Sequence, residues 1–195
     1  TITLTGNGGT APYTFIYSIN GVPQPAVVSN AAGSYLITVP TTVANTFTYA
    51  VTSVQEGSAN ACTRSNLTGQ SATVIVNPLP TAVIAGSTTV CLNAPSPPPV
   101  TFTASGGTAP YTFAYTINGV AQAPVISNGA GVATLNAQTN VAGPLVYAIT
   151  MVTDNSSTLC SQTFNNVSTT VTVNDLPTAS ISGSATAVRA LARVS

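Results

Sequence analysis

The chain has 195 residues, only 3% of them charged, and a formal net charge of zero at pH 7. It contains no histidine, which excludes Ser–His or Cys–His catalysis and histidine metal ligands. Zero net charge gives no electrostatic footprint for nucleic acid or an anionic membrane. No apolar run approaches the roughly 18 residues of a transmembrane helix, and nothing resembles a signal peptide, so a mature form or an internal fragment is expected.

An eight-residue block occurs twice. Gly8–Phe15 has the sequence Gly-Gly-Thr-Ala-Pro-Tyr-Thr-Phe, which returns unchanged 98 positions later at Gly106–Phe113. The similarity continues to the Leu-Pro-Thr-Ala segments at 79–82 and 176–179. The chain is therefore predicted to be a tandem array of one module of about 97 residues.

The first strong element of each module is an alternating aromatic stripe. Aromatic or aliphatic side chains occupy every second position of 13–19 and of 111–117, which predicts a strand with one buried face. Each stripe ends at an Asn-Gly pair, 20–21 or 118–119, the strongest short hairpin signal. We expect the rings to form core, and the alternative is a platform on which carbohydrate rings stack.

The remaining strand-like runs are short. In the second module they are 100–104, 132–135, 145–153 and 167–173, with counterparts in the first, and no helix is expected in residues 1–180. Short strands separated by frequent turn signals predict an all-β fold of tandem Ig-like (PKD-like) antiparallel β-sandwiches.

Proline-containing joints close each module at 77–80 and 174–177. They are short, so a fixed orientation of neighbouring modules is expected. The predicted organisation is an Ig-like module at 1–80 that lacks its first strand, a complete Ig-like module at 81–177, and a first strand of a following module, or donor strand, at 178–195.

Residues suited to chemistry are sparse. The carboxylates Glu56, Asp154 and Asp175 stand far apart, and the first two occupy equivalent turns of different modules. A general acid–base pair or a multi-carboxylate calcium site is therefore not expected. The sequence predicts no enzyme activity, no catalytic residue, no cofactor and no metal.

The segment Gly-Gly-Thr-Ala-Pro-Tyr-Thr-Phe-x-Tyr-x-Ile-Asn-Gly, the late cysteine and the Leu-Pro-Thr-Ala joint resemble the PKD-like, Ig-like tandem repeats of large Bacteroidota surface adhesins of the gliding-adhesin type. This resemblance implies secretion, an extracellular or cell-surface location and a structural or adhesive role. The charged, lysine-containing surfaces of many such repeats are absent from this chain.

Three cysteines are present, and an extracellular setting favours disulfides. From the phase of the modules, Cys91 and Cys160 are expected to form a bridge, leaving Cys62 without a partner in its own chain. The alternative is three free thiols. Glycosylation is expected as an alternative source of solubility at the acceptor triplets of Asn66, Asn155 and Asn166, although a Thr- and Asn-rich chain also produces such triplets by chance.

The segment 178–195 aligns with 81–98, the first strand of the second module. Two interpretations follow: one period of a longer covalent array, or separate subunits that exchange a strand head-to-tail. The inter-subunit strand would present Ala179, Ile181, Gly183, Ala185 and Val188. Residues 188–193 depart from the repeat, as a divergent donor strand or as sequence foreign to it.

The sequence therefore predicts a structural module of an extracellular bacterial surface filament or stalk-like adhesin. Its expected partners are copies of itself or adjacent modules of the same polypeptide, without nucleic acid or a transmembrane segment. The alternatives are a glycan- or ligand-binding adhesin domain and a noncatalytic spacer of a large secreted protein.

Overall fold

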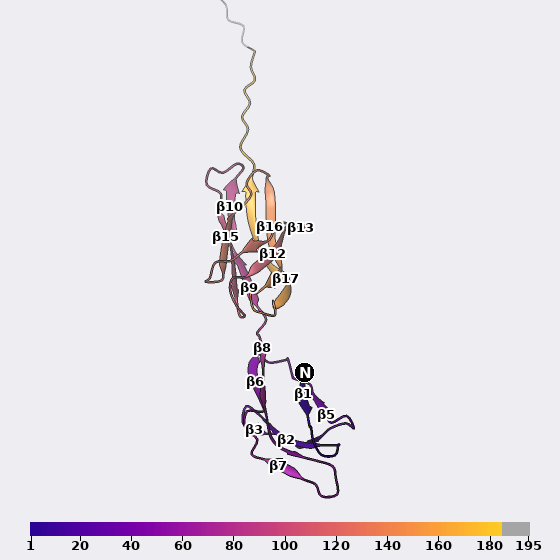
Figure 1. Cartoon of the computed structure of the whole chain (residues 1–195). Helices are drawn as coiled ribbons and strands as arrows, with labels where there is room; N and C mark the ends of the chain where they lie inside the picture. The colour runs from indigo at the N-terminus through magenta and orange to yellow at the C-terminus, as the bar shows by residue number, and fades with distance from the viewer. Residues whose placement is uncertain (185–195) are drawn as a thin grey trace, which may run out of the picture.

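The computed structural model describes residues 1–184, and all the helices and strands assigned in that range are strands, with no helix among them. The prediction of an all-β chain without helices is confirmed for these residues. Figure 1 shows two groups of strands that follow one another along the chain. We call them the first module (β1–β8) and the second module (β9–β17).

The first module contains two sheets. One pairs β1 with β5 alone, and the other has the order β3-β2-β6-β7, with β4 on β2 and β8 on β6. The strands are β1 (Ile2–Thr5), β2 (Thr14–Ile19), β3 (Val22–Pro23), β4 (Val27–Val28), β5 (Ser34–Ile37), β6 (Asn45–Gln55), β7 (Thr63–Ser65) and β8 (Ser71–Val76).

The second module has the same plan with two further strands at its start. One sheet has the order β15-β11-β9, and the other has the order β10-β17-β16-β12-β13, with β14 on β12. The strands are β9 (Thr81–Ala85), β10 (Thr88–Cys91), β11 (Pro99–Ser105), β12 (Thr112–Ile117), β13 (Val120–Ala121), β14 (Val125–Ile126), β15 (Val132–Asn136), β16 (Gly143–Thr153) and β17 (Ser161–Asn174). This is the two-sheet plan of Ig-like sandwiches.

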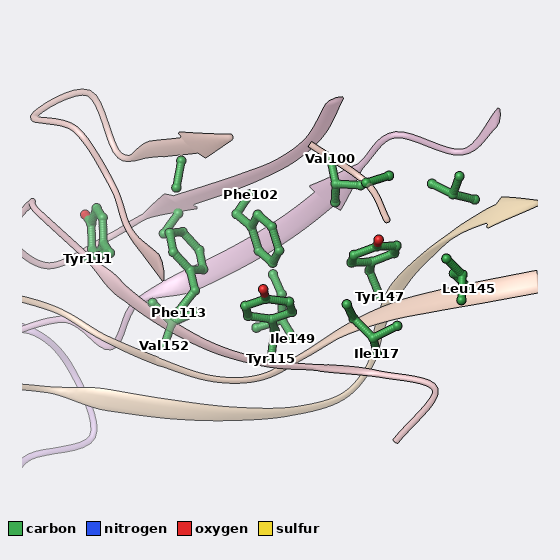
Figure 2. Packing of buried hydrophobic residues seen from close by; sticks show 14 of the residues in the cluster. Val100, Phe102, Tyr111, Phe113, Tyr115, Ile117, Leu145, Tyr147, Ile149 and Val152 are labelled. Carbon is green, nitrogen blue, oxygen red and sulfur yellow. The ribbon is translucent and has the colours of Figure 1, made fainter. Parts of the chain in front are cut away.

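The aromatic stripes lie in the core, as predicted. Figure 2 shows the second module's cluster, in which the ring of Phe102 lies 5.6 Å from that of Phe113 and 5.1 Å from that of Tyr115. Phe113 is fully buried, and its counterpart Phe15 is 2% exposed. Burying a phenylalanine side chain contributes about 1.5–3 kcal/mol, so these stripes fix which face of β2 and β12 points inward.

Both Asn-Gly pairs form the expected hairpin turns. The φ angles are 50° and 80° at Asn20 and Gly21, and 49° and 81° at Asn118 and Gly119. Positive φ at both central residues is the requirement of a type I′ turn. The hairpin prediction is therefore confirmed in both modules.

The joint between the modules packs onto the second one. Pro80 is fully buried, and the side-chain amide of Asn77 donates a hydrogen bond to Thr158 Oγ1 at 2.9 Å. A Cβ at Gly106 would lie 2.9 Å from the Leu79 carbonyl oxygen, so glycine permits this close approach. The module boundaries themselves remain a prediction.

Candidate functional site

A long groove lies on the first module between β1 and the sheet that carries β6. Its volume is about 1050 Å³. Ile2 and Leu4 of β1 and Tyr49, Val51 and Val54 of β6 line it, together with a larger number of polar residues from β1 and from the segment 63–71. The groove is therefore an opening toward the core between the two sheets.

The equivalent positions of the second module are sealed. Val100 and Phe102 on β11 are fully buried, as is Val152 on β16. Of their counterparts, Leu4 is also buried at 6% exposed, whereas Ile2 and Val54 are only partly buried and pack against the first core cluster. The difference follows from β9, β10 and the residue after β10, because Ala82 and Ile84 of β9, Val90 of β10 and Leu92 pack against the second core.

The backbone of β1 shows the same contrast. In the second module, β11 pairs antiparallel with β15 on one side and with β9 on the other. Within residues 1–184, β1 pairs with β5 alone. The edge of β1 that corresponds to the β9 side of β11 has no strand partner among the described residues.

The segment predicted to supply an inter-subunit strand is extended away from both modules. Residues 178–184 have no strand assignment and are exposed, and Ile181 is 100% exposed. Figure 1 shows this segment leaving the second module on the side away from the first. Ala179, Ile181 and Gly183 lie within it, whereas Ala185 and Val188 lie outside the described residues.

The carboxylates of Asp154 and Glu56, at equivalent positions of the two modules, fix loops by accepting hydrogen bonds. Asp154 is 3% exposed and accepts hydrogen bonds from the Thr108 N–H at 3.0 Å and the Ser156 hydroxyl at 2.7 Å. Glu56 accepts from the Thr10 N–H and the Ser58 hydroxyl, both at 2.8 Å. Each carboxylate therefore clasps the Gly-Gly-Thr loop of its own module.

The backbone itself calls for the second glycine of the repeated block, because φ is 77° at Gly9 and 74° at Gly107. A Cβ at Gly107 would collide with the Asp154 carboxylate, and one at Gly9 would collide with that of Glu56. The sequence predicted a tight turn there but missed the carboxylate. The available signal was the equivalent position of the only two carboxylates outside the joints.

Hydrogen bonding lowers the pKa of both carboxylates. Burial, the strongest single influence at Asp154, raises its pKa, but hydrogen bonds from Ser156, Thr108 and Cys160 together outweigh it. At Glu56, the hydrogen bond from Ser58 is the main cause of the lowered pKa. Both groups are held ionised as acceptors.

The predicted Cys91–Cys160 disulfide is wrong. All three cysteines are free. Cys91 lies opposite Asn174 because β10 runs parallel to the end of β17, while Cys160 precedes the first residue of that 14-residue strand. The partner strand β16 covers Ser161–Val173 in ten residue steps, Gly143–Thr153, so at roughly 3.3 Å per residue the two cysteines lie more than about 30 Å apart. A bridge requires Cα atoms within about 7 Å.

Cys62 lines the groove and is exposed. A hydrogen bond to Glu56, and then the negative charge of that carboxylate, raise the pKa of the Cys62 thiol. Because the thiolate is the reactive form, this environment makes Cys62 a poor nucleophile at neutral pH.

The aromatic residues do not form a stacking platform. None of the seven tyrosines and five phenylalanines is exposed, and the two stripes fill the cores. The carbohydrate-stacking alternative for these stripes is therefore wrong.

Three further sequence predictions concern glycosylation, metal binding and membrane-spanning helices. Asn66, Asn155 and Asn166 are exposed, and glycosylation at them stays a prediction. Within residues 1–184, no three Cys, Asp or Glu side chains gather as metal ligands would. No helix in the same range is long and apolar enough to cross a membrane.

Comparison with known proteins identifies no family. No protein-family model matches the chain, and no curated protein matches it. Fibronectin(III)-like modules of CbhA from Clostridium thermocellum superpose with a TM-score of 0.37 at 13% identity, over 92% of this chain and 88% of that one.

A second solved structure concerns host cell surface retention of a 1.5-MDa bacterial ice-binding adhesin. Its TM-score is 0.40 at 18% identity, over 88% of this chain, which spans 56% of that structure. Both TM-scores lie below 0.5, so neither similarity identifies a relative or a function. The Bacteroidota resemblance stays a prediction.

Proposed function

We propose that this chain is a noncatalytic structural repeat of an extracellular surface filament or stalk, arranged head-to-tail with copies of itself or with adjacent modules. The observation that carries the proposal is one two-sheet plan that occurs twice in succession, with the same Gly-Gly-Thr-Ala-Pro-Tyr-Thr-Phe block at 8–15 and 106–113. A short joint links the two modules and packs on the second, with Pro80 fully buried. The sequence of residues 81–87, which begin the second module, returns at 178–184 in five of seven positions, as in a tandem array.

Composition supports the same role. The chain has six charged residues, and its surface is kept polar mainly by Thr, Ser and Asn. Low charge reduces electrostatic repulsion between copies and favours association. For a free cytosolic protein this is a liability, whereas neighbouring subunits of a filament benefit from it.

The cellular part of the proposal is tested on intact cells that produce the protein. An antibody against the whole chain should label the cell exterior or detached filaments, and added protease should remove the signal without lysis. A periplasmic or cytosolic marker followed in parallel controls for leakage. Signal that is protected until the cells are lysed would contradict an extracellular role.

The same material can be run on a denaturing gel. A band near 19.4 kDa is expected for separate subunits, and a very large band for a continuous polypeptide of adjacent modules. Both results agree with a structural repeat, and they distinguish its two forms.

A further inference from the structure

Asparagine followed by glycine occurs at four places in the chain, at 7–8, 20–21, 118–119 and 128–129. This pair is chemically unstable in water, because the main-chain nitrogen of the glycine can attack the side-chain carbonyl carbon of the asparagine, and glycine has no side chain to hinder the attack. The reaction requires the asparagine side chain to lie over the peptide bond that follows it. The hydrogen bonds of the asparagine amide therefore decide whether a pair reacts.

The two hairpin pairs hold the asparagine amide away from its glycine. Asn118 Oδ1 accepts from the Val146 N–H at 2.8 Å, and its Nδ2 donates to the Pro144 carbonyl oxygen at 3.1 Å. Both partners lie on β16, so the amide is fixed across the sheet through its oxygen and its nitrogen. The amide of Asn20 is fixed on β6 in the same way. Attack by the glycine nitrogen would require these bonds to break, so the hairpin pairs are protected.

The amide of Asn128 has the opposite arrangement. This residue lies in the loop between β14 and β15, and its Oδ1 accepts from the Ala130 N–H and from the Val132 N–H, both at 3.0 Å. A bond from the side chain to the N–H two residues later is an Asx turn, in which the side chain curls over its own following backbone. The ring closed by this hydrogen bond contains Asn128 Cγ and the Gly129 nitrogen, the two atoms that the reaction joins. Their approach therefore needs little rearrangement.

Two further features of this loop favour the attack. The N–H groups of Ala130 and Val132 point at Oδ1, the oxygen on which negative charge develops when the nitrogen adds to Cγ, and donors placed in this way stabilise an oxyanion. Within residues 1–184, neither the Gly129 N–H nor the Asn128 Nδ2 donates a hydrogen bond. Both residues are exposed, so water reaches the attacking nitrogen and the leaving group.

We propose that Asn128 is a site of spontaneous covalent modification. The Gly129 nitrogen bonds to Asn128 Cγ and loses its proton to water, while the bond from Cγ to Nδ2 breaks and Nδ2 leaves with that proton equivalent as ammonia. The product is a cyclic imide. Water then adds to one of the two imide carbonyl carbons and opens the ring, which leaves aspartate or isoaspartate at position 128. The net change is the uptake of water and the release of ammonia, without an oxidant or a second enzyme.

The loop accommodates one product better than the other. An aspartate at position 128 keeps both N–H donors, and hydrogen bonds to a charged acceptor are the stronger kind. Isoaspartate lengthens the main chain by a methylene and converts the carbonyl that accepts from the Gly131 N–H at 3.0 Å into a free carboxylate. Either product adds a negative charge to a chain whose formal net charge is zero. Repulsion between neighbouring copies therefore rises as the protein ages.

Incubation of the full chain at mildly alkaline pH tests the inference. Asn118 and Asn128 lie in one peptide between the chymotryptic sites Tyr115 and Tyr147, so fragment-ion mass spectrometry reads both conversions from one sample. Asn128 should convert about 10-fold faster than Asn118 or more, because the hairpin amide must first lose two hydrogen bonds. Asn20, followed in its own peptide, should be as slow as Asn118.

The same chain in a denaturing concentration of urea is the control for local sequence. The hydrogen bonds that separate the two arrangements are then lost, and Asn128, Asn118 and Asn20 should convert at similar rates. A difference that persisted in urea would show that the folded loop does not cause the selectivity.

Two matched substitutions test the position of the attack. A Cβ at Gly129 would meet nothing within 4 Å, so Gly129→Ala should fold normally and slow conversion at Asn128 about 10-fold. Asn30 occupies the equivalent position of the first module, where its Oδ1 accepts from the Ser34 N–H at 3.0 Å, but Ala31 follows it. Ala31→Gly should raise conversion at Asn30 by a similar factor. Thermal unfolding of both variants checks that they are folded.

Conversion at Asn128 in the folded chain, with Asn118 and Asn20 protected, supports the inference. Equal rates at Asn128 and Asn118 in the folded chain, protection of Asn128, or no effect of Gly129→Ala would each overturn it. These outcomes are independent of the proposed function, because the reaction depends on the loop and on water alone.

Discussion

Two equivalent tyrosines show how one residue can separate otherwise similar modules. The hydroxyl oxygen of Tyr147 accepts a hydrogen bond from the Gln138 N–H at 2.8 Å. The hydroxyl of Tyr49 is buried and has no hydrogen-bond partner within residues 1–184. Pro40 occupies the position equivalent to Gln138, and proline has no N–H to donate.

Replacement of each tyrosine by phenylalanine should therefore have opposite consequences. Tyr147→Phe removes a hydrogen bond and should lower the free energy of unfolding by about 1 kcal/mol, while Tyr49→Phe removes an unsatisfied hydroxyl and should be neutral or stabilising by up to about 1 kcal/mol. Urea denaturation of both variants beside the parent chain measures the difference. Equal losses in the two variants would contradict this assignment.

The clasping carboxylates make stability dependent on pH. Their folded-state pKa values lie below the ordinary values, which are about 3.9 for Asp and 4.3 for Glu. Their contribution is therefore present above the ordinary pKa and is lost as the pH falls through the lowered folded-state values. We expect the melting temperature to fall as the pH is lowered from 5 to 2.

The variant Glu56→Gln combined with Asp154→Asn should show a smaller fall over this range, although it starts from a lower stability at pH 7. Thermal unfolding followed at several pH values makes the comparison. Asp175→Asn serves as a control, because Asp175 is exposed and lies outside both clasps. A parallel fall in the double variant and the parent would show that the clasps do not cause the acid sensitivity.

At the scale of elements, each Asn-Gly hairpin also anchors the neighbouring strand. Asn118 Oδ1 accepts from the Val146 N–H at 2.8 Å, and its Nδ2 donates to the Pro144 carbonyl at 3.1 Å. Asn20 makes the same pair of contacts with the Thr48 N–H and the Thr46 carbonyl. The side chain therefore ties β12 to β16, and β2 to β6.

Asn118→Gly tests this second role, because glycine tolerates the positive φ of the turn. The loss of two partly exposed hydrogen bonds should lower the free energy of unfolding by about 1–2 kcal/mol. Gln122→Ala is a suitable control, since the Gln122 side chain bonds only within its own exposed turn. If both variants retained parental stability in urea, the anchor would be energetically irrelevant.

Sequence periodicity predicted the strands whose environment alternates. Both aromatic stripes, the Asn-Gly turns and runs such as 145–153 were identified because side chains of β-strands alternate between core and water. The extent of β17 was underestimated, since its first half, Ser161–Asn166, carries mainly polar residues. Its strand character depends on pairing with β16, which local pattern does not report.

The failed disulfide has the same origin. A parallel pairing such as that of β10 with β17 joins segments about 80 residues apart. Nothing in the sequence of either segment shows whether the two strands pair in a parallel or an antiparallel direction. The sequence separation of Cys91 and Cys160 therefore could not show that Cys91 lies beside the last residue of β17, whereas Cys160 lies just before its first residue. The groove was not predicted: the sequence predicted only that the first module lacks its first strand, and the residues of β6 that line the groove become evident once the two sheets are placed.

At the scale of the whole molecule, several apolar side chains on short strands of both modules are exposed to water. In the second module, Val120 is 66% and Ile126 is 67% exposed, and their counterparts Val22 and Val28 are 62% and 54% exposed. The same short strands, β3 with β4 and β13 with β14, carry these side chains in both modules. The two modules therefore expose similar apolar side chains at equivalent positions.

Lateral packing of arrays should therefore depend on apolar contact more than on charge. With six charged residues and zero net charge, there is little electrostatic repulsion or attraction for salt to screen. We expect turbidity and fibre width in electron micrographs to change less than about 2-fold between 0.02 and 0.5 M NaCl. The double substitution Val28→Thr with Ile126→Thr, which keeps β-branched residues on the strands, should reduce fibre width by weakening side-by-side contact. Strong salt dependence, or unchanged width in the variant, would show that other surfaces bring the arrays together.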